Sequence, residues 1–266
     1  MKLDLYQIDS FIDSELKGNP ACVVPLNEWY SDEVLLNIAK ENAVAETAFF
    51  IESENRFYLR WFTPEIEMDL CGHATLAAAH CIKTILGYKN KKIIFETLSG
   101  DLVISCRNDY YSMDFPSRVP FSSELPEIIL QSLNITPKEV YKARDFLLLY
   151  ESEKQIKDIR IDKVIFDQIN LGYGGVIVTS KGENSDFVSR YFTPQSSILE
   201  DPVTGSSHCT LTPFWSKRLN KKKLEAIQLS KRGGFLKCLD KGKRVIVSGK
   251  AKTCSSKTLI LILIIS

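Results

Sequence analysis

The stretch FTPEIEMDLCGHATLAAAH, residues 62–80, combines a Phe-Thr-Pro turn with carboxylates, a Cys-Gly-His and a run of small residues. Gly72 allows a tight turn from a strand into a helix. The helix has almost no polar face before His80, and a helix that is small or apolar on all sides is normally buried. The stretch therefore predicts a strand, an acidic turn and a central helix around which strands pack closely.

The same pattern returns in the other half of the chain. Phe192-Thr193-Pro194 is followed by Glu200 and Asp201, and then by Gly205-Ser206-Ser207-His208. A tripeptide often recurs by chance, but here the tripeptide, the acidic turn, the glycine and the helix recur in one order, which indicates an internal duplication. A proline-bounded linker at 116–120 separates the halves. We therefore predict one domain over residues 1–117 and a second over residues 118–266.

Length and composition narrow the class of protein. With 266 residues the chain is long enough for one large domain or two medium ones. Its 34 basic and 33 acidic residues give a net charge of +1, which argues against a nucleic-acid platform or a binder of anionic membranes. The longest apolar run, Leu259–Ile265, is far shorter than the roughly 20 residues that cross a bilayer. We expect a small-molecule partner, and neither nucleic acid nor membrane.

Cysteine and histidine usage points to a chain without metal or disulfides. The seven cysteines form no CxxC pair, and no secretory signal is readable at the N-terminus, so we expect reduced thiols and a cytoplasmic location. Three histidines without zinc spacing leave little material for a metal site. We predict neither a metal nor a cofactor.

Periodicity predicts an α+β chain. A helix is expected after Ser31, and another after Gly205, where Pro213 should bend or restart it. Alternating or apolar runs predict strands at 3–8, 21–24, 47–51, 57–62, 92–96, 102–105, 112–115, 146–150, 174–179, 187–192 and 244–248.

The two glycine-led helix starts have two readings. A helix N-terminus exposes unbonded N–H groups and a positive partial charge, so a matched pair would suit a substrate that carries carboxylates. Alternatively, Gly72 and Gly205 only make tight turns between a strand and a helix.

Several motifs, in order along nearly the whole chain, resemble the phenazine-biosynthesis isomerase-like (PhzF) family. The Cys-Gly-His-Ala-Thr and Asp-Pro-Val-Thr-Gly-Ser motifs together are specific, whereas Gly-Asn-Pro alone is weak. The matching segments are Gly18–Val24, Ala45–Phe49, Arg60–Pro64, Asp69–Thr75 and Glu200–Cys209, with a weaker match at Gln228, Ser230 and Arg232–Gly234.

The resemblance implies the diaminopimelate epimerase-like fold, with two pseudo-symmetric lobes, each a β-barrel around a central α-helix. It also implies that homodimers are common, and that a last strand, at about 257–266, returns to the first lobe. The chain departs from the family pattern after Ala251. The apolar tail 259–265 is a closing strand, an altered form of it, or an edge that joins two copies.

Two chemistries compete in this fold. Epimerases of the wider superfamily use two cysteines, one at each helix start. Cys71 matches one of these positions, but Thr204 stands at the other, and a threonine hydroxyl is not a base near neutral pH. The isomerase branch uses a single carboxylate, and Glu46 stands at the matching position. One carboxyl group can both remove and return a proton.

The resemblance implies a site made of catalytic Glu46, His73 and Asp201. Asn19, Gly72, Gly205 and Ser206 would bind the substrate. From the residues alone each has a plainer role: Glu46 would be a solvated strand-edge acid, while the polar side chains at the helix starts would cap or turn the backbone.

We therefore predict a cofactor-independent isomerase that moves a proton on a small carboxylate-bearing substrate, in a cytoplasmic homodimer. The alternative is a non-catalytic binding or regulatory homologue that has kept the site but lost its chemistry. A cysteine-dependent epimerase or racemase is the third possibility.

Overall fold

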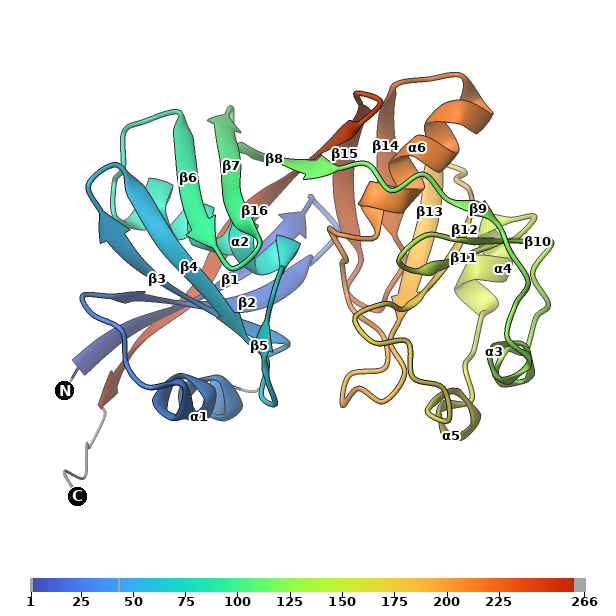
Figure 1. The fold of residues 1–266 in the computed structure, drawn as a ribbon. Coiled ribbons are helices and arrows are strands. Elements are labelled where there is room, and N and C mark those ends of the chain that lie inside the picture. The colour runs from blue at the N-terminus through green and yellow to red at the C-terminus, as the bar shows by residue number, and fades with distance from the viewer. Residues whose placement is uncertain (1, 43, 261–266) are drawn as a thin grey trace. The chain divides into compact units, whose positions relative to one another are not determined.

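The computed structural model describes residues 2–42 and 44–260. The chain mixes helices and strands and divides into two compact units (Figure 1). The first unit holds the chain up to Ile12, Gly18–Asp114 and the chain from Ser248 onward, and the second holds Asp13–Lys17 and Phe115–Val247. No helix in the described ranges is long and apolar enough to cross a membrane.

The first unit is a closed barrel. Its neighbouring strands follow the order β1-β2-β3-β4-β6-β7-β8-β16, and β16 closes the barrel by pairing antiparallel to β1. Its elements are β1 (Lys2–Ile12), β2 (Asn19–Leu26), α1 (Asp32–Asn42), β3 (Glu46–Ser53), β4 (Arg56–Phe62), β5 (Glu67–Met68), α2 (Gly72–His80), the π-helical turn η1 (Cys81–Ile85), β6 (Lys92–Thr97), β7 (Gly100–Arg107), β8 (Tyr110–Pro116) and β16 (Arg244–Ile260), of which β8 ends and β16 begins in the second unit.

The apolar tail that the sequence analysis singled out begins at the end of the closing strand. Leu259 pairs with Leu3 and Ile260 pairs with Lys2, so β16 follows β1 along its whole length. Residues 261–265 of the predicted tail lie outside the described residues.

The helix α2 is buried along nearly its whole length. Every residue from Gly72 to Ala79 is buried, and the alanines at 74, 77, 78 and 79 have almost no exposed surface. The helix packs against β1, β2 and β3 (Figure 1). Because alanine side chains are short, the strands can approach the helix backbone closely, and the packing density of a protein core is reached without large side chains.

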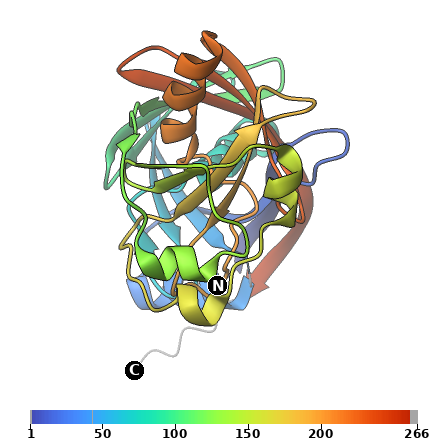
Figure 2. The ribbon, with the colours of Figure 1, turned by 90° about the vertical axis from the view of Figure 1, so that its right-hand side faces the viewer.

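The second unit wraps a sheet around α6. Its strands follow the order β15-β14-β13-β12-β11-β10-β9. Its elements are β9 (Phe121–Ser122), α3 (Glu127–Ser132), β10 (Glu139–Lys142), β11 (Phe146–Leu149), α4 (Glu153–Asp158), α5 (Lys163–Phe166), β12 (Val176–Lys181), β13 (Phe187–Phe192), α6 (His208–Leu219), β14 (Lys223–Gln228) and β15 (Gly234–Asp240). Figure 2 shows α6 at the end of this unit opposite to α3 and α5.

Aromatic contacts hold α6 against several strands. Trp215 stacks on Phe187 of β13 with 5.8 Å between ring centroids, and its Nε1 donates a hydrogen bond to Oγ1 of Thr179 on β12. Phe214 meets Tyr141 of β10 edge to face. Because these partners come from three strands, the sheet curves around the helix.

Pro213 was predicted to bend or restart the second helix, and it does not restart it, since α6 is continuous through it. A proline lacks the N–H that would bond to the carbonyl four residues earlier, here that of Cys209. That carbonyl instead accepts a hydrogen bond of 2.9 Å from the backbone N–H of Arg118. The linker between the two halves therefore supplies the donor that the proline lacks.

The strand pairings of the two units repeat each other. In the first unit β2 is parallel to β3, β3 antiparallel to β4, β4 parallel to β6, and β6 antiparallel to β7. In the second unit β11, β12, β13, β14 and β15 pair in the same sequence of directions. The central helix leaves the equivalent strand in each unit, since α2 follows β4 and α6 follows β13. The register shows which residues are equivalent. Thr47 pairs with Phe62 in the first unit, and Val176 pairs with Phe192 in the second.

Candidate functional site

A carboxylate, an imidazole and a thiol meet in the first unit. Glu46 is the first residue of β3, while Cys71 and His73 flank Gly72 at the start of α2. Nε2 of His73 lies 3.1 Å from Oε2 of Glu46, and Nδ1 of the same ring lies 3.5 Å from Sγ of Cys71. The side chains of His73 and Glu46 are 4% and 17% exposed, so the group is largely removed from water.

Local hydrogen bonds fix the start of α2. The hydroxyl of Ser10 on β1 donates to the carbonyl of His73 at 2.8 Å, and the hydroxyl of Thr75 donates to the carbonyl of Cys71 at 2.5 Å. The backbone N–H groups of Gly72 and His73 have no acceptor among the described residues. A helix start with such groups can bind an anion.

The neighbours of the His73 ring set its charge. Burial disfavours a charged imidazole, but Cys71 and Glu46 outweigh burial and raise the pKa of His73 well above its usual value. Burial, and then the charge of Glu46, raise the pKa of the Cys71 thiol. These contacts therefore favour the protonated form of the His73 ring, and burial favours the protonated form of the Cys71 thiol. The contact between His73 and Glu46 lacks the alignment of a regular hydrogen bond, so Oε2 of Glu46 keeps an acceptor site.

The same three side chains offer donor atoms of types that bind metals, all within 4.8 Å of one another. However, the His73 ring presents Nδ1 to the thiol and Nε2 to the carboxylate. An ion bound to one ring nitrogen would have one of the other two donors on the far side of the ring. The arrangement fits a chain of polar contacts better than three ligands around one ion.

Asn19 lies on the strand next to Glu46. It is fully buried at the start of β2, where it pairs with Ser10 of β1. Ala21, two residues further along β2, pairs with Glu46 in the parallel register. Asn19 therefore belongs to the same unit as Glu46, Gly72 and His73.

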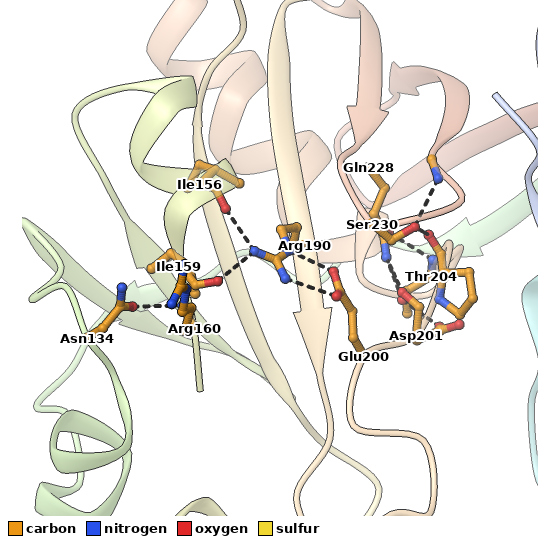
Figure 3. A network of polar contacts seen from close by, with 12 residues as sticks. Asn134, Ile156, Ile159, Arg160, Arg190, Glu200, Asp201, Thr204, Gln228 and Ser230 are labelled. Atoms are coloured by element: carbon orange, nitrogen blue, oxygen red, sulfur yellow. Dashed lines mark hydrogen bonds and ion pairs between the residues drawn. The ribbon is translucent and has the colours of Figure 1, made fainter. Parts of the chain in front are cut away.

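The remaining predicted site residues, Asp201, Gly205 and Ser206, lie in the second unit. The hydroxyl of Thr204 donates to Oδ2 of Asp201 at 2.5 Å, and the side-chain amide of Gln228 donates to the carbonyl of Asp201 at 2.8 Å (Figure 3). Gln228 also accepts from the backbone N–H of Thr204. Thr204, which stands where a second thiol would stand, is thus a hydrogen-bond partner of Asp201.

Ser206 contacts a charged side chain that the sequence analysis did not single out. A terminal N–H of Arg144 donates to Oγ of Ser206 at 3.1 Å. The neighbouring Asp145 is fully buried, and its Oδ1 accepts from the hydroxyl of Tyr191 and the N–H of Gly175, each at 3.0 Å. A charged pair directly before the apolar strand 146–149 was the available signal.

Each acidic turn is held by an arginine that binds its glutamate through two nitrogens. Arg190 donates from Nε and a terminal nitrogen to the two carboxylate oxygens of Glu200, at 2.7 and 2.9 Å, and also donates to the carbonyls of Ile156 and Ile159 (Figure 3). In the first unit Arg60 binds Glu67 in the same way, at 2.7 and 2.6 Å. These clamps fix the backbone that leads to α2 and to Asp201.

Comparisons with known proteins match this chain over nearly its whole length. The PhzC-PhzF family model, described as phenazine biosynthesis-like protein, matches residues 8–257. A Pseudomonas aeruginosa protein named as an uncharacterized isomerase is 43% identical over 97% of this chain and 99% of its own. A Halalkalibacterium halodurans protein of the same description is 40% identical over 98% of this chain and 100% of its own.

Solved structures share the fold. The crystal structure of a PhzF-family phenazine biosynthesis protein of Enterococcus faecalis superposes with a TM-score of 0.93 at 41% identity, covering 98% of this chain and 100% of that one. A hydroxyproline epimerase of Agrobacterium vitis, at 10% identity, shares the fold with a TM-score of 0.62 over 97% of this chain and 92% of its own. The expected diaminopimelate epimerase-like fold is thereby confirmed. Fold, family match and relatives agree, and the chain belongs to the phenazine biosynthesis-like PhzC-PhzF family and is an isomerase.

Proposed function

We propose that this isomerase works without a cofactor and moves a proton between two carbons of a small carboxylate-bearing substrate, with Glu46 as both acid and base. The observation that carries the proposal is the half-buried Glu46 carboxylate, which lies 3.1 Å from Nε2 of His73 and keeps an acceptor site on Oε2. A base in this position is partly shielded from water and held at a fixed place beside a proton donor.

The proposed reaction is a redox-neutral shift of a double bond. Glu46 takes a proton from a carbon next to a conjugated system, and the C–H electron pair enters that system. The resulting carboxylic acid then gives the proton to another carbon, and the Glu46 carboxylate is restored. The N–H groups of Gly72 and His73 are available to bind the negative charge that develops on the substrate. No electron is gained or lost, so the step needs no redox cofactor.

Solvent-deuterium incorporation tests the proposal. The purified protein is incubated in D₂O with a panel of small cyclic and linear unsaturated carboxylates, and each compound is followed by NMR. We expect at least one member to gain deuterium at a carbon that does not exchange in buffer alone. Binding of panel members without any exchange would favour the alternative of a non-catalytic binding homologue.

Replacing Cys71 with serine separates the proposal from a thiol mechanism. The serine hydroxyl can keep a hydrogen bond to Nδ1 of His73 but cannot act as a thiol base. We therefore expect deuterium exchange in Cys71→Ser to stay within about tenfold of the wild-type rate, because general-base removal typically costs about 100-fold or more. A loss of that larger size, in a variant with unchanged circular dichroism, would support the cysteine-dependent epimerase instead.

A further inference from the structure

Because the two units repeat each other, the position of Glu46 in the first unit has an equivalent position in the second. In the first unit Thr47 pairs with Phe62, and in the second unit Val176 pairs with Phe192. Val176 is therefore the counterpart of Thr47. The residue before each gives a second equivalent pair, Gly175 and Glu46. An added Cβ at Gly175 would lie 2.6 Å from the ring carbon and hydroxyl of Tyr191. The second unit therefore has no room for an acid at this position, because Tyr191 fills the space.

The start of the central helix is equivalent in the same way. Thr204-Gly205-Ser206 of the second unit matches Cys71-Gly72-His73 of the first in the two related motifs. His73 contacts an acid, whereas Ser206 contacts the guanidinium of Arg144. The unit without the acid thus has a cation beside its helix start.

Arg144 is held in place and partly open to solvent. Its side chain is 26% exposed, and its Nε lies 3.5 Å from Oδ1 of the fully buried Asp145. Burial disfavours the charge on Arg144, but Asp145 and Tyr191 outweigh it and raise the pKa of Arg144, so the guanidinium stays charged. The charge of Asp145 is shared with the N–H of Gly175 and the hydroxyl of Tyr191. The pair therefore buries its negative end and presents its positive end.

The turn before α6 also offers backbone donors. The N–H groups of Gly205 and Ser206 have no acceptor among the residues that the structure describes. A guanidinium offers five N–H donors in a planar fork that matches a carboxylate, and the partners of Arg144 are Asp145, Ser206 and Tyr191. Donors of the fork and of the backbone are thus available at the start of α6.

We propose that Arg144 is a specificity-determining residue that binds a carboxylate of the substrate beside Ser206. This inference rests on the proposed function for the identity of the ligand as a substrate. The first unit has an acid beside the start of its central helix, whereas the second has a cation that selects a carboxylate over its neutral analogue.

Paired acids and amides test this selection without any need for turnover. Benzoate, crotonate and cyclohexene-1-carboxylate are titrated beside benzamide, crotonamide and cyclohexene-1-carboxamide, and dissociation constants are measured by ligand-observed NMR. We expect at least one acid to bind the wild-type protein about 10- to 100-fold more tightly than its amide, the size expected for a charged hydrogen-bonded pair. In Arg144→Met this preference should fall to within about twofold, while Arg144→Lys should keep part of it.

Matched controls guard against misfolding. Arg160→Met removes an exposed arginine of the same unit and should leave the preference unchanged. The double variant Arg144→Met/Asp145→Asn avoids a buried unpaired charge, since an asparagine oxygen can still accept from Gly175 and Tyr191. It should behave like Arg144→Met. In the wild-type protein, added sulfate should weaken the binding of the acid but not of the amide.

The results separate this inference from the proposed function. The proposed role of Arg144 is wrong if the folded double variant still prefers the acid over the amide. It is also wrong if the wild-type protein shows no such preference. The titrations are repeated in Glu46→Gln, in which proton transfer is removed but the preference should remain. If the wild-type protein shows no deuterium exchange but the preference depends on Arg144, the proposed function fails and the anion site stands.

Discussion

Replacing Glu46 with glutamine is expected to lower the rate of deuterium exchange into a substrate by about 100- to 10,000-fold, the range typical of general acid–base catalysis. Glutamine keeps the size of the side chain and can still contact His73, but its amide cannot accept a proton from carbon at neutral pH. The substrate should therefore still bind. The measurement is the initial rate of deuterium incorporation at saturating substrate, with the dissociation constant determined separately.

Glu52→Gln is the matched control for this variant. Glu52 lies on β3, as Glu46 does, but its side chain is exposed. Its replacement should leave the exchange rate within about twofold of the wild-type value, because surface substitutions usually change little. If Glu46→Gln exchanges deuterium at a rate near that of Glu52→Gln, the base is another residue and the proposed mechanism is wrong.

Replacing Arg190 with methionine is expected to lower the free energy of unfolding by about 2–4 kcal/mol. The side chains of Arg190 and Glu200 are only 14% and 22% exposed, so the variant leaves a carboxylate largely buried without its partner. It also leaves the carbonyls of Ile156 and Ile159 without their donor. Urea denaturation followed by fluorescence and circular dichroism measures the change.

Arg56→Met provides the comparison for a surface pair. Arg56 binds Asp101 at 2.8 Å, but both side chains are about half exposed. Exposed pairs contribute at most about 1 kcal/mol, so this variant should change stability by less than that. Equal effects of Arg190→Met and Arg56→Met would show that the clamp on the acidic turn contributes no more than an ordinary surface contact.

The sequence predicted the features that repeat or that have a strong period. The strands around the Phe-Thr-Pro turns and the buried alanine helix that begins at Gly72 follow from local patterns, and the structure contains them. The second helix begins at His208, three residues after Gly205. The hairpin of β14 and β15 was not predicted, although Leu224 and Ala226 alternate with the charged residues Lys223 and Glu225. That alternation is short and bounded by lysines, so it resembles a solvated turn in the sequence.

Local sequence patterns could not predict contacts between residues that lie far apart in the chain. Pro213 was expected to bend or restart its helix, and the donor that bonds to the carbonyl it leaves free comes from Arg118, which lies far away in the sequence. Arg144 received no role because its partners, Ser206 and Tyr191, lie some fifty or more positions away in the sequence. The thiol of Cys71 was considered only as a base, whereas the structure places it against the ring of His73.

The membership of β16 in both units bears on how the polypeptide emerges from the ribosome. Arg244–Val247 complete the second unit, while Ser248–Ile260 supply the strand that seals the first. The barrel of the first unit therefore cannot close, and one edge of β1 stays unpaired, until the ribosome has synthesised the chain up to residue 260. Until then the edge of β1 can pair with strands of other chains, so association between unfinished chains is the misfolding route that this topology favours.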